Sequence, residues 1–459
     1  METMKGTDLT TGSIWRHLIV FSVPMLVGSL MQTAYSVINA IWVGNGLGAE
    51  SMAAIAVSFP LIFLLVAVVN GLSMGSSVLV SQHYGAKNLD KVTEVINNAF
   101  VIGLLISGIS MVVGYYGAEP ILKLNGTPTE VLPIAASYMR YFVGTFPSMF
   151  GIFMLAACLR GTGDSKTPLY FQAGGLLVAC ILDPVLMFGW LGAPKMGLNG
   201  AALATILAQT GGFLGLLYYL HRKRHLARPR LRGFRLDRGT IWLILVIGVP
   251  STLQQALVSV GMVLIIGLVN GFGKDAVAAY GAAMRIDQIA FMPAMTIGMA
   301  ISTVAGQNIG AGLFDRVKRT FWVGVALGVI STLPATLLAL VVPEVILRLF
   351  LQEPEVLNIG CHYLHIMGLG YLIFSIMFVS NGVINGAGKT FVTTLVSLIA
   401  LWGIRIPLAT YLSKTSLHIE GIWYSIVFSS FIGMSISLLY FASGRWRVKL
   451  VSPNKPSVR

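Results

Sequence analysis

The chain has 459 residues, of which 56% are hydrophobic and only 10% are charged, and its mean hydropathy is +0.80. Soluble domains carry roughly a quarter charged residues, so this composition excludes an ordinary soluble globular protein. The formal net charge is +14, but we expect no nucleic-acid partner, because membrane proteins gather Lys and Arg on their cytoplasmic side.

Twelve apolar runs follow one another along the chain, each long enough for the ~20 residues that a spanning helix needs. Period-2 alternation is absent, and a backbone in hydrocarbon must pair its polar groups internally, so we expect helices rather than a β-barrel. The fold class predicted is an all-α polytopic membrane protein. The predicted spans are 17–43, 52–80, 92–117, 130–158, 167–190, 198–221, 240–269, 276–304, 317–343, 355–384, 392–413 and 419–443.

The Lys and Arg residues are divided unevenly between the two sets of loops that join these spans. Twenty-three fall in the termini and every second loop, against five in the alternate loops. Because cytoplasmic loops carry the excess of Lys and Arg, we expect both termini to be cytoplasmic. The most basic run then lies in a central cytoplasmic loop, where it would face anionic lipid headgroups: "HRKRHLARPRLRGFRLDRG" at 221–239.

A polar phrase that follows the second span is written twice. "SQHYGAKNLDKV" (81–92) returns 225 positions later (306 − 81) as "GQNIGAGLFDRV" (306–317). The glycine-containing turns "YGAK" and "IGAG" in the two copies suit the left-handed residue that ends many helices. The aspartate that follows each turn suits the N-terminus of the next helix. We interpret the phrase as a duplicated turn.

A second phrase repeats at the same separation, since "RGTGDSKTP" (160–168) returns as "NGAGKTFVT" (385–393). We therefore predict two pseudo-symmetric six-helix lobes, 1–221 and 240–459, joined by a basic linker at 222–239. Six is an even number of spans, so both lobes have the same orientation in the membrane. Transporters built from such parallel repeats bind their substrates between the repeats.

Two of the seventeen acidic residues fall well inside predicted spans, where a carboxylate is costly and usually functional. Asp183, in the fifth span, precedes Pro184, whose ring interrupts the helical hydrogen-bond ladder. It either caps the bend or carries a proton, since burial favours a neutral carboxyl group. Asn39 of the first span can hydrogen-bond Asp183 if the two spans approach. Gln32 and Tyr35 share the face of Asn39, and we expect them to line a substrate cavity.

The second lobe has its own polar groups inside spans seven and eight. Span seven contains Gln254 and Gln255 but no glutamate. Asp287 in span eight follows Arg285 by two positions, a spacing that does not share a helix face. These two charges either tie span eight to a neighbouring helix or face the substrate, and we assign both of them and both glutamines to the substrate cavity.

Another polar cluster is "CHYLH" at 361–365, in which His362 and His365 stand one turn apart beside Cys361. It offers no evident carboxylate partner, and a position at the membrane surface explains it better than a metal site. The chain has three cysteines, far apart in sequence, so no disulfide framework is expected. We predict neither a metal nor a cofactor.

Several motifs together resemble the multidrug and toxic compound extrusion (MATE) transporters, and most closely the bacterial branch that includes DNA-damage-inducible protein F. The resemblance covers both lobes. The motifs are "SMGSSVLVSQHYGAKNLDKV", "LRGTGDSKTPLY", "ILDPVLMFG", "LNGAALAT" and "AMTIGMAISTVAGQNIGAG".

The resemblance implies a twelve-helix fold whose two lobes enclose a V-shaped cavity. It also implies a secondary antiporter in the bacterial inner membrane, acting as a monomer, which exports amphipathic or cationic drugs in exchange for H⁺ or Na⁺. Asp183 matches an important aspartate of the family's N-terminal half. Where relatives commonly carry a second aspartate, this chain has Asn39, and spans seven and ten lack the acidic residues of a Na⁺ site. We therefore expect H⁺ to be the coupling ion, with Na⁺ less favoured.

Other function classes have weaker support. No Walker A motif or other enzyme constellation is present in the sequence, so we expect a transporter and not an enzyme. The main alternative is a flippase for lipids or lipid-linked precursors of the same superfamily. Such a protein would need a cationic cavity, and Arg140, Arg285 and Arg405 lie in predicted spans.

Overall fold

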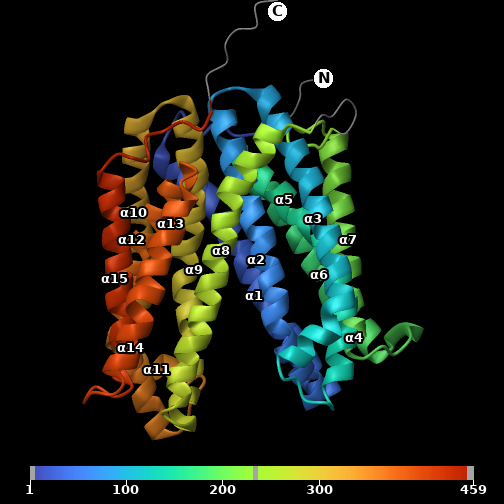
Figure 1. Cartoon of the computed structure of the whole chain (residues 1–459), viewed down its shortest axis with the longest axis vertical. Coiled ribbons are helices and arrows are strands. Elements are labelled where there is room, and N and C mark those ends of the chain that lie inside the picture. Colours follow the sequence, from blue (N-terminus) through green and yellow to red (C-terminus); the bar gives the residue numbers. More distant parts are fainter. Residues whose placement is uncertain (1–5, 231–235, 452–459) are drawn as a thin grey trace, which may run out of the picture. The chain divides into compact units, whose positions relative to one another are not determined.

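The computed structural model describes residues 6–230 and 236–451, and this part of the chain contains helices and no strands (Figure 1). Twelve of its helical stretches are long and apolar enough to cross a membrane. The all-α, twelve-helix prediction is therefore confirmed. Of the predicted linker at 222–239, residues 231–235 lie outside the described chain.

The first six spans match the predicted runs, although most helices extend a few residues beyond them because polar terminal turns are still helical. The fourth span is broken by a 3₁₀ turn at Val143–Thr145, immediately before Pro147 in the first turn of the next helix. Hydropathy gave no sign of this break. The helices are α1 (Ile14–Leu47), α2 (Ala49–Gly85), α3 (Leu89–Leu124), α4 (Leu132–Phe142), α5 (Phe146–Gly161), α6 (Lys166–Phe188) and α7 (Leu198–Arg222).

The last six spans contain one irregular helix, the eleventh. It combines α13 and α14 through a π-helical stretch at Leu398–Arg405, which ends just before Pro407. Proline cannot donate to the helical ladder, so a change of hydrogen-bond register is tolerated there. The helices are α8 (Arg238–Asn270), α9 (Lys274–Ala311), α10 (Phe314–Val341), α11 (Pro343–Leu347), α12 (Pro354–Gly386), α13 (Thr390–Ser397), α14 (Ile406–Leu412) and α15 (Glu420–Ala442).

The described chain forms two compact units, and each includes the beginning of a helix that continues in the other. Unit 1 takes in α1 from Val23 onward and α8 as far as Val249. Unit 2 takes in the first turns of α1 and the rest of α8 from Pro250. Both divisions lie beside a proline inside a helix, Pro24 in α1 and Pro250 in α8. The lobe boundaries read from the repeats, 1–221 and 240–459, stay a prediction about the duplicated sequence.

Helices α9 and α12 are in close backbone contact in unit 2. A Cβ atom added at Gly298 of α9 would lie 2.8 Å from the carbonyl oxygen of Phe378 in α12. Small residues allow such close contact between membrane helices, which gain no hydrophobic free energy from pairing in lipid. The contact fixes the position of α12 side chains relative to α9.

The two copies of the duplicated phrase use their glycines differently. Neither Gly85 nor Gly310 has a positive φ; the left-handed residues are Lys87 and Gly312, two positions later. A Cβ at Gly85 would lie 1.8 Å from the carbonyl oxygen of Gln307, so close backbone contact requires glycine there. The predicted glycine C-cap is therefore confirmed in the second copy, at Gly312, and wrong in the first copy, where Lys87 takes the left-handed conformation.

The polar residues of the phrase also hold the chain segment that precedes α1. In unit 2, the backbone N–H of Leu9 donates to Gln307 Oε1 at 2.9 Å, and Asn308 Nδ2 donates to the carbonyl of Leu9 at 3.3 Å. Leu9 itself is 2% exposed. The second copy of the phrase thus forms a turn and also binds the N-terminal segment through hydrogen bonds.

Candidate functional site

Helices α1 and α6 pack together in unit 1 around an apolar cluster that includes Val43 and Met187, both fully buried. Val43 lies one turn after Asn39 on α1, and Met187 lies one turn after Asp183 on α6. Because residues four apart share a helix face, this packing turns Asn39 and Asp183 toward each other. Asn39 Nδ2 donates to Asp183 Oδ2 at 3.0 Å, so the predicted contact between spans one and five is present.

Asp183 is completely buried, yet only one of its two oxygens is satisfied. Asp183 Oδ1 has no hydrogen-bond partner in the described chain. The side chain of Tyr35 also interacts with this carboxylate. Among residues 6–230 and 236–451, no Lys, Arg or His forms an ion pair with Asp183. A carboxyl group in this setting is best accommodated as a neutral, protonated group.

Two residues near Asp183 were not predicted from the sequence: Thr205 of α7 and Tyr138 of α4. Tyr35 interacts with Thr205 of α7 as well as with Asp183, and the buried Tyr138 of α4 lies within electrostatic range of the same carboxylate. Thr205 ends the motif "LNGAALAT", which was the available signal. The sequence pattern did not predict Tyr138, because the direction of its side chain depends on the orientation of α4 about its own axis.

Gln32 lies one turn before Tyr35 on α1 but does not join this cluster. Its side chain is exposed, whereas those of Tyr35 and Asn39 are partly buried. The three residues share one face of α1. Tyr35 and Asn39 interact with Asp183, whereas Gln32 lies one turn further toward the N-terminus of the helix. The role of Gln32 and Tyr35 in a substrate cavity stays a prediction.

Asp287 of α9 is satisfied on both oxygens, unlike Asp183. Tyr371 of α12 donates to Asp287 Oδ1 at 2.7 Å, and Tyr363, two turns earlier on α12, donates to Oδ2. Asp287 is 8% exposed, and both tyrosines are buried. The arrangement ties α9 to α12 and favours the structural alternative over contact with a substrate.

The other predicted cavity residues of the second lobe are also held by neighbours within unit 2. Arg285 is exposed, and its guanidinium lies over the ring of Phe350, 6.0 Å from the centroid. Gln254 Nε2 donates to Ser397 Oγ at 2.7 Å and so links α8 to α13. Gln255 is partly buried. A shared substrate role for these residues stays a prediction.

Two further cations inside spans have partners in their own units. Arg140 of α4 pairs with Glu119 at 3.1 Å. Arg405 donates to the hydroxyl oxygens of Ser429 at 2.8 Å and Ser430 at 2.9 Å. Arg140 thus has a carboxylate partner, and Arg405 has neutral hydroxyl acceptors.

The "CHYLH" stretch does have a carboxylate partner, contrary to its interpretation from sequence. His362 Nδ1 contacts Glu420 Oε1 of α15 at 2.5 Å. Glu420 is 58 positions away, so the pair was not visible in the motif. Among residues 6–230 and 236–451, no three His, Cys, Asp or Glu side chains gather as metal ligands would.

Comparison with known proteins identifies the family. The MatE family model matches residues 24–185 and again 250–411, two stretches that lie 226 positions apart (250 − 24). The probable multidrug resistance protein YoeA of Bacillus subtilis (strain 168) is 34% identical over 445 residues, 96% of each chain. The probable multidrug resistance protein YpnP of the same organism is 33% identical over 452 residues, 97% of this chain and 98% of its own.

The fold agrees with solved structures of the family. One is described as the outward-facing conformation of a multidrug resistance MATE family transporter of the MOP superfamily. It superimposes with a TM-score of 0.90 at 21% identity, covering 96% of this chain and 98% of its own. These matches confirm the resemblance seen in the motifs, and the relatives are bacterial, as that resemblance implied. The chain is therefore a multi-pass membrane protein that belongs to the MatE family.

Proposed function

We propose that the protein is a secondary active antiporter that exports amphipathic or cationic drugs and other toxic organic compounds in exchange for H⁺. Relatives that align over nearly the whole chain are named multidrug resistance proteins, and the family is one of transporters, not enzymes. The setting we infer is the bacterial inner membrane, with both termini in the cytoplasm and a monomer as the working unit. A reporter inserted into the linker at 222–239 should therefore give a cytoplasmic signal.

The observation that carries the proposal is the incomplete hydrogen bonding of Asp183. This carboxyl group is fully buried, and the amide of Asn39 donates to one of its two oxygens. Its second oxygen has no hydrogen-bond partner in the described chain. A membrane-embedded carboxyl group that is not paired with a cation is the kind of group that proton relays use.

The same geometry favours H⁺ over Na⁺ as the coupling ion. Sodium and other hard cations need several carboxylate or carbonyl oxygens around them. Asn39 presents the donor end of its amide to Asp183, which suits a carboxyl group and not a metal ion. In unit 2 the carboxylate of Asp287 is already occupied by two tyrosine hydroxyls.

Proton transfer at Asp183 would change the contact between α1 and α6. An ionised Asp183 accepts a charge-assisted hydrogen bond from Asn39, and a neutral one accepts a weaker bond. Pro184 follows directly, and residue 180 receives no helical hydrogen bond from it, so this part of α6 is able to bend. If the proton binds one conformation of the transporter more tightly than the other, protonation shifts the population toward that conformation. Antiport requires this coupling between proton binding and conformation.

The flippase alternative has less support. It relied on cations inside the spans that could hold a pyrophosphate. Arg140 is paired with Glu119, Arg405 donates to two serines, and Arg285 lies over Phe350. These contacts, together with the names of the relatives, favour drug efflux.

The proposal is tested by ethidium efflux from proteoliposomes under an imposed pH gradient or, separately, an imposed Na⁺ gradient. We expect efflux with the pH gradient and none with Na⁺ at constant pH. Asp287→Asn is the matched control for Asp183→Asn, since both remove one buried carboxylate. Efflux driven by Na⁺ alone would overturn the choice of ion. Failure to move any compound of a broad cation panel, with activity on a lipid-linked substrate, would overturn drug efflux itself.

A further inference from the structure

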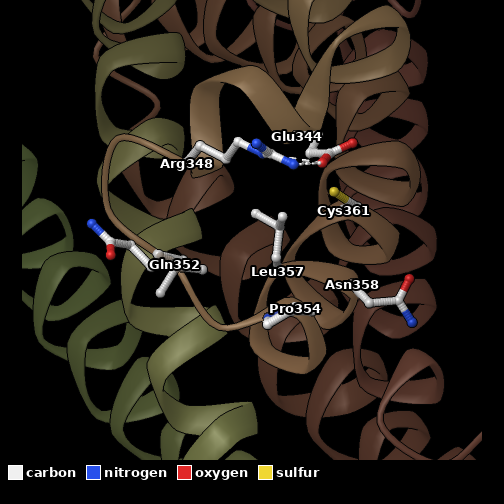
Figure 2. Close-up of a pocket in the computed structure, with 8 residues that line it drawn as sticks. Glu344, Arg348, Gln352, Pro354, Leu357, Asn358 and Cys361 are labelled. Atoms are coloured by element: carbon white, nitrogen blue, oxygen red, sulfur yellow. Dashed lines mark hydrogen bonds and ion pairs between the residues drawn. The ribbon is translucent and has the colours of Figure 1, made fainter.

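A cavity of about 550 Å³ lies at the junction of α11 and α12 in unit 2 (Figure 2). Leu351 and the mostly buried Leu357 supply apolar lining, and Glu344, Arg348 and Cys361 supply the polar lining considered below. This cavity contains none of the residues around Asp183 or Asp287. The ion-coupling site therefore does not account for it.

The two charged residues of this cavity are paired in an incomplete way. Arg348 donates from both Nε, at 3.1 Å, and Nη2, at 2.6 Å, to the single oxygen Oε1 of Glu344. These two hydrogen bonds leave Glu344 Oε2 and Arg348 Nη1 unused. The side chains are 54% and 68% exposed. The carboxylate oxygen Oε2 of Glu344 and the Nη1 group of Arg348 are therefore both available to a ligand.

The charged pair is flanked by large apolar side chains that no part of unit 2 covers. Val341 is 72% exposed, Val345 65% and Leu349 78%. The short helix α11 joins two candidate spans, α10 and α12, and therefore stands at a membrane surface. Exposed apolar residues beside charged ones at the end of a span are typical of the interface between headgroups and acyl chains.

We propose that this cavity binds the headgroup of a phospholipid that carries both a phosphate and a primary ammonium. The phosphate is placed on Arg348 Nη1, because guanidinium groups bind phosphate oxygens well. The ammonium is placed on Glu344 Oε2, and the acyl chains run along Val345 and Leu349. A purely anionic headgroup would meet the carboxylate, an organic cation would meet the guanidinium, and a trimethylated amine cannot donate a hydrogen bond to Glu344.

Cys361 provides a native reporter, since its thiol lies in the cavity and Figure 2 shows it beside the ion pair. The experiment uses the full chain in nanodiscs of phosphatidylcholine, with or without phosphatidylethanolamine. The rate of N-ethylmaleimide modification is measured for each cysteine by peptide mass spectrometry. We expect phosphatidylethanolamine to slow Cys361 about threefold if the lipid exceeds its dissociation constant about twofold. Cys180 lies on α6, in unit 1, and is the internal control. Its modification rate should not change.

Three variants test whether the charges are responsible. Glu344→Gln and Arg348→Gln should each abolish the protection, and both positions are exposed, so the fold should tolerate them. The exchange Glu344→Arg with Arg348→Glu keeps the pair and should retain part of the protection. The proposal is overturned by equal protection in phosphatidylcholine, by protection from phosphatidylglycerol, by protection from an amphipathic cation alone, or by protection that survives Glu344→Gln.

Discussion

Asp183 in unit 1 and Asp287 in unit 2 are both buried carboxylates on proline-containing membrane helices, yet their hydrogen bonding differs. Asp287 receives a tyrosine hydroxyl on each oxygen, and both donors come from one closely packed neighbour, α12. Asp183 receives one amide and keeps a bare oxygen. A satisfied buried polar group adds rigidity, whereas an unsatisfied one costs stability and therefore calls for an explanation such as a function. Under the proposed function, Asp287 contributes stability and Asp183 exchanges the proton.

The largest expected effect follows from removing the carboxyl group of Asp183. Asp183→Asn should reduce pH-driven dye efflux to the level of empty liposomes, because an amide cannot carry the exchanged proton. The protein should remain folded, since Asn keeps an oxygen that can accept from Asn39. Proteoliposome efflux and size-exclusion elution check the two parts. Full activity in this variant would contradict the role of Asp183.

Asp287→Asn should have the opposite profile. The O–H of one tyrosine would lose its acceptor, because an NH₂ group only donates, and a buried donor left unsatisfied costs about 1–3 kcal/mol. We expect a lower apparent melting temperature in detergent, with pH-driven efflux per folded molecule retained. Tyr371→Phe should show a smaller loss of the same kind. Unchanged stability together with lost efflux would reverse the assignment of the two carboxylates.

The packing that holds Asp287 in place can be strained without touching any polar group. Gly298→Ala places a methyl group against the backbone of α12, and overpacking of this kind costs about 1–3 kcal/mol. Gly281→Ala is the matched control on the same helix, because nothing lies within 4 Å of its added Cβ. Equilibrium unfolding in detergent should separate the two variants. Equal stability would show that α9 and α12 do not need their close contact.

The smallest expected effect is a partial change of ion preference. Asn39→Asp would place a second carboxylate beside Asp183, where two like charges avoid joint ionisation by sharing a proton or a cation. The site at present offers too few carboxylate oxygens to bind Na⁺, and this substitution adds them. We expect weak Na⁺-driven efflux to appear beside the pH-driven activity, measured in the same proteoliposomes. Asn39→Ser, which adds no carboxylate, should not show it.

The helices were predictable from the sequence because membrane insertion depends on local hydropathy. The fold class, the twelve spans and the family followed from apolar runs and short motifs. The irregular stretches did not, since the 3₁₀ turn before Pro147 and the π-helix before Pro407 lie inside apolar runs that look uniform. A glycine C-cap was predicted in both copies of the duplicated phrase, but in the first copy Lys87 is the left-handed residue, and backbone contact with Gln307 requires Gly85.

The candidate site was predictable only in part. The Asn39–Asp183 contact followed from two polar groups that both had to avoid lipid. The tyrosines on Asp287 lie 76 and 84 positions away, and their reach depends on the rotation of α12 about its axis. Hydropathy does not encode that rotation when a helix is apolar on all sides. For the same reason Asp287 was assigned to the cavity together with Arg285, although the structure directs the two side chains to different neighbours.

Substrate-induced proton release tests the central claim most directly. Dye is added to the purified protein in weakly buffered detergent solution, and the pH change is recorded. We predict that the intact chain and Asp287→Asn each release up to about one proton per molecule, because substrate favours the deprotonated carboxyl group, and that Asp183→Asn releases none. Unchanged release from Asp183→Asn, or release lost only in Asp287→Asn, would contradict the account.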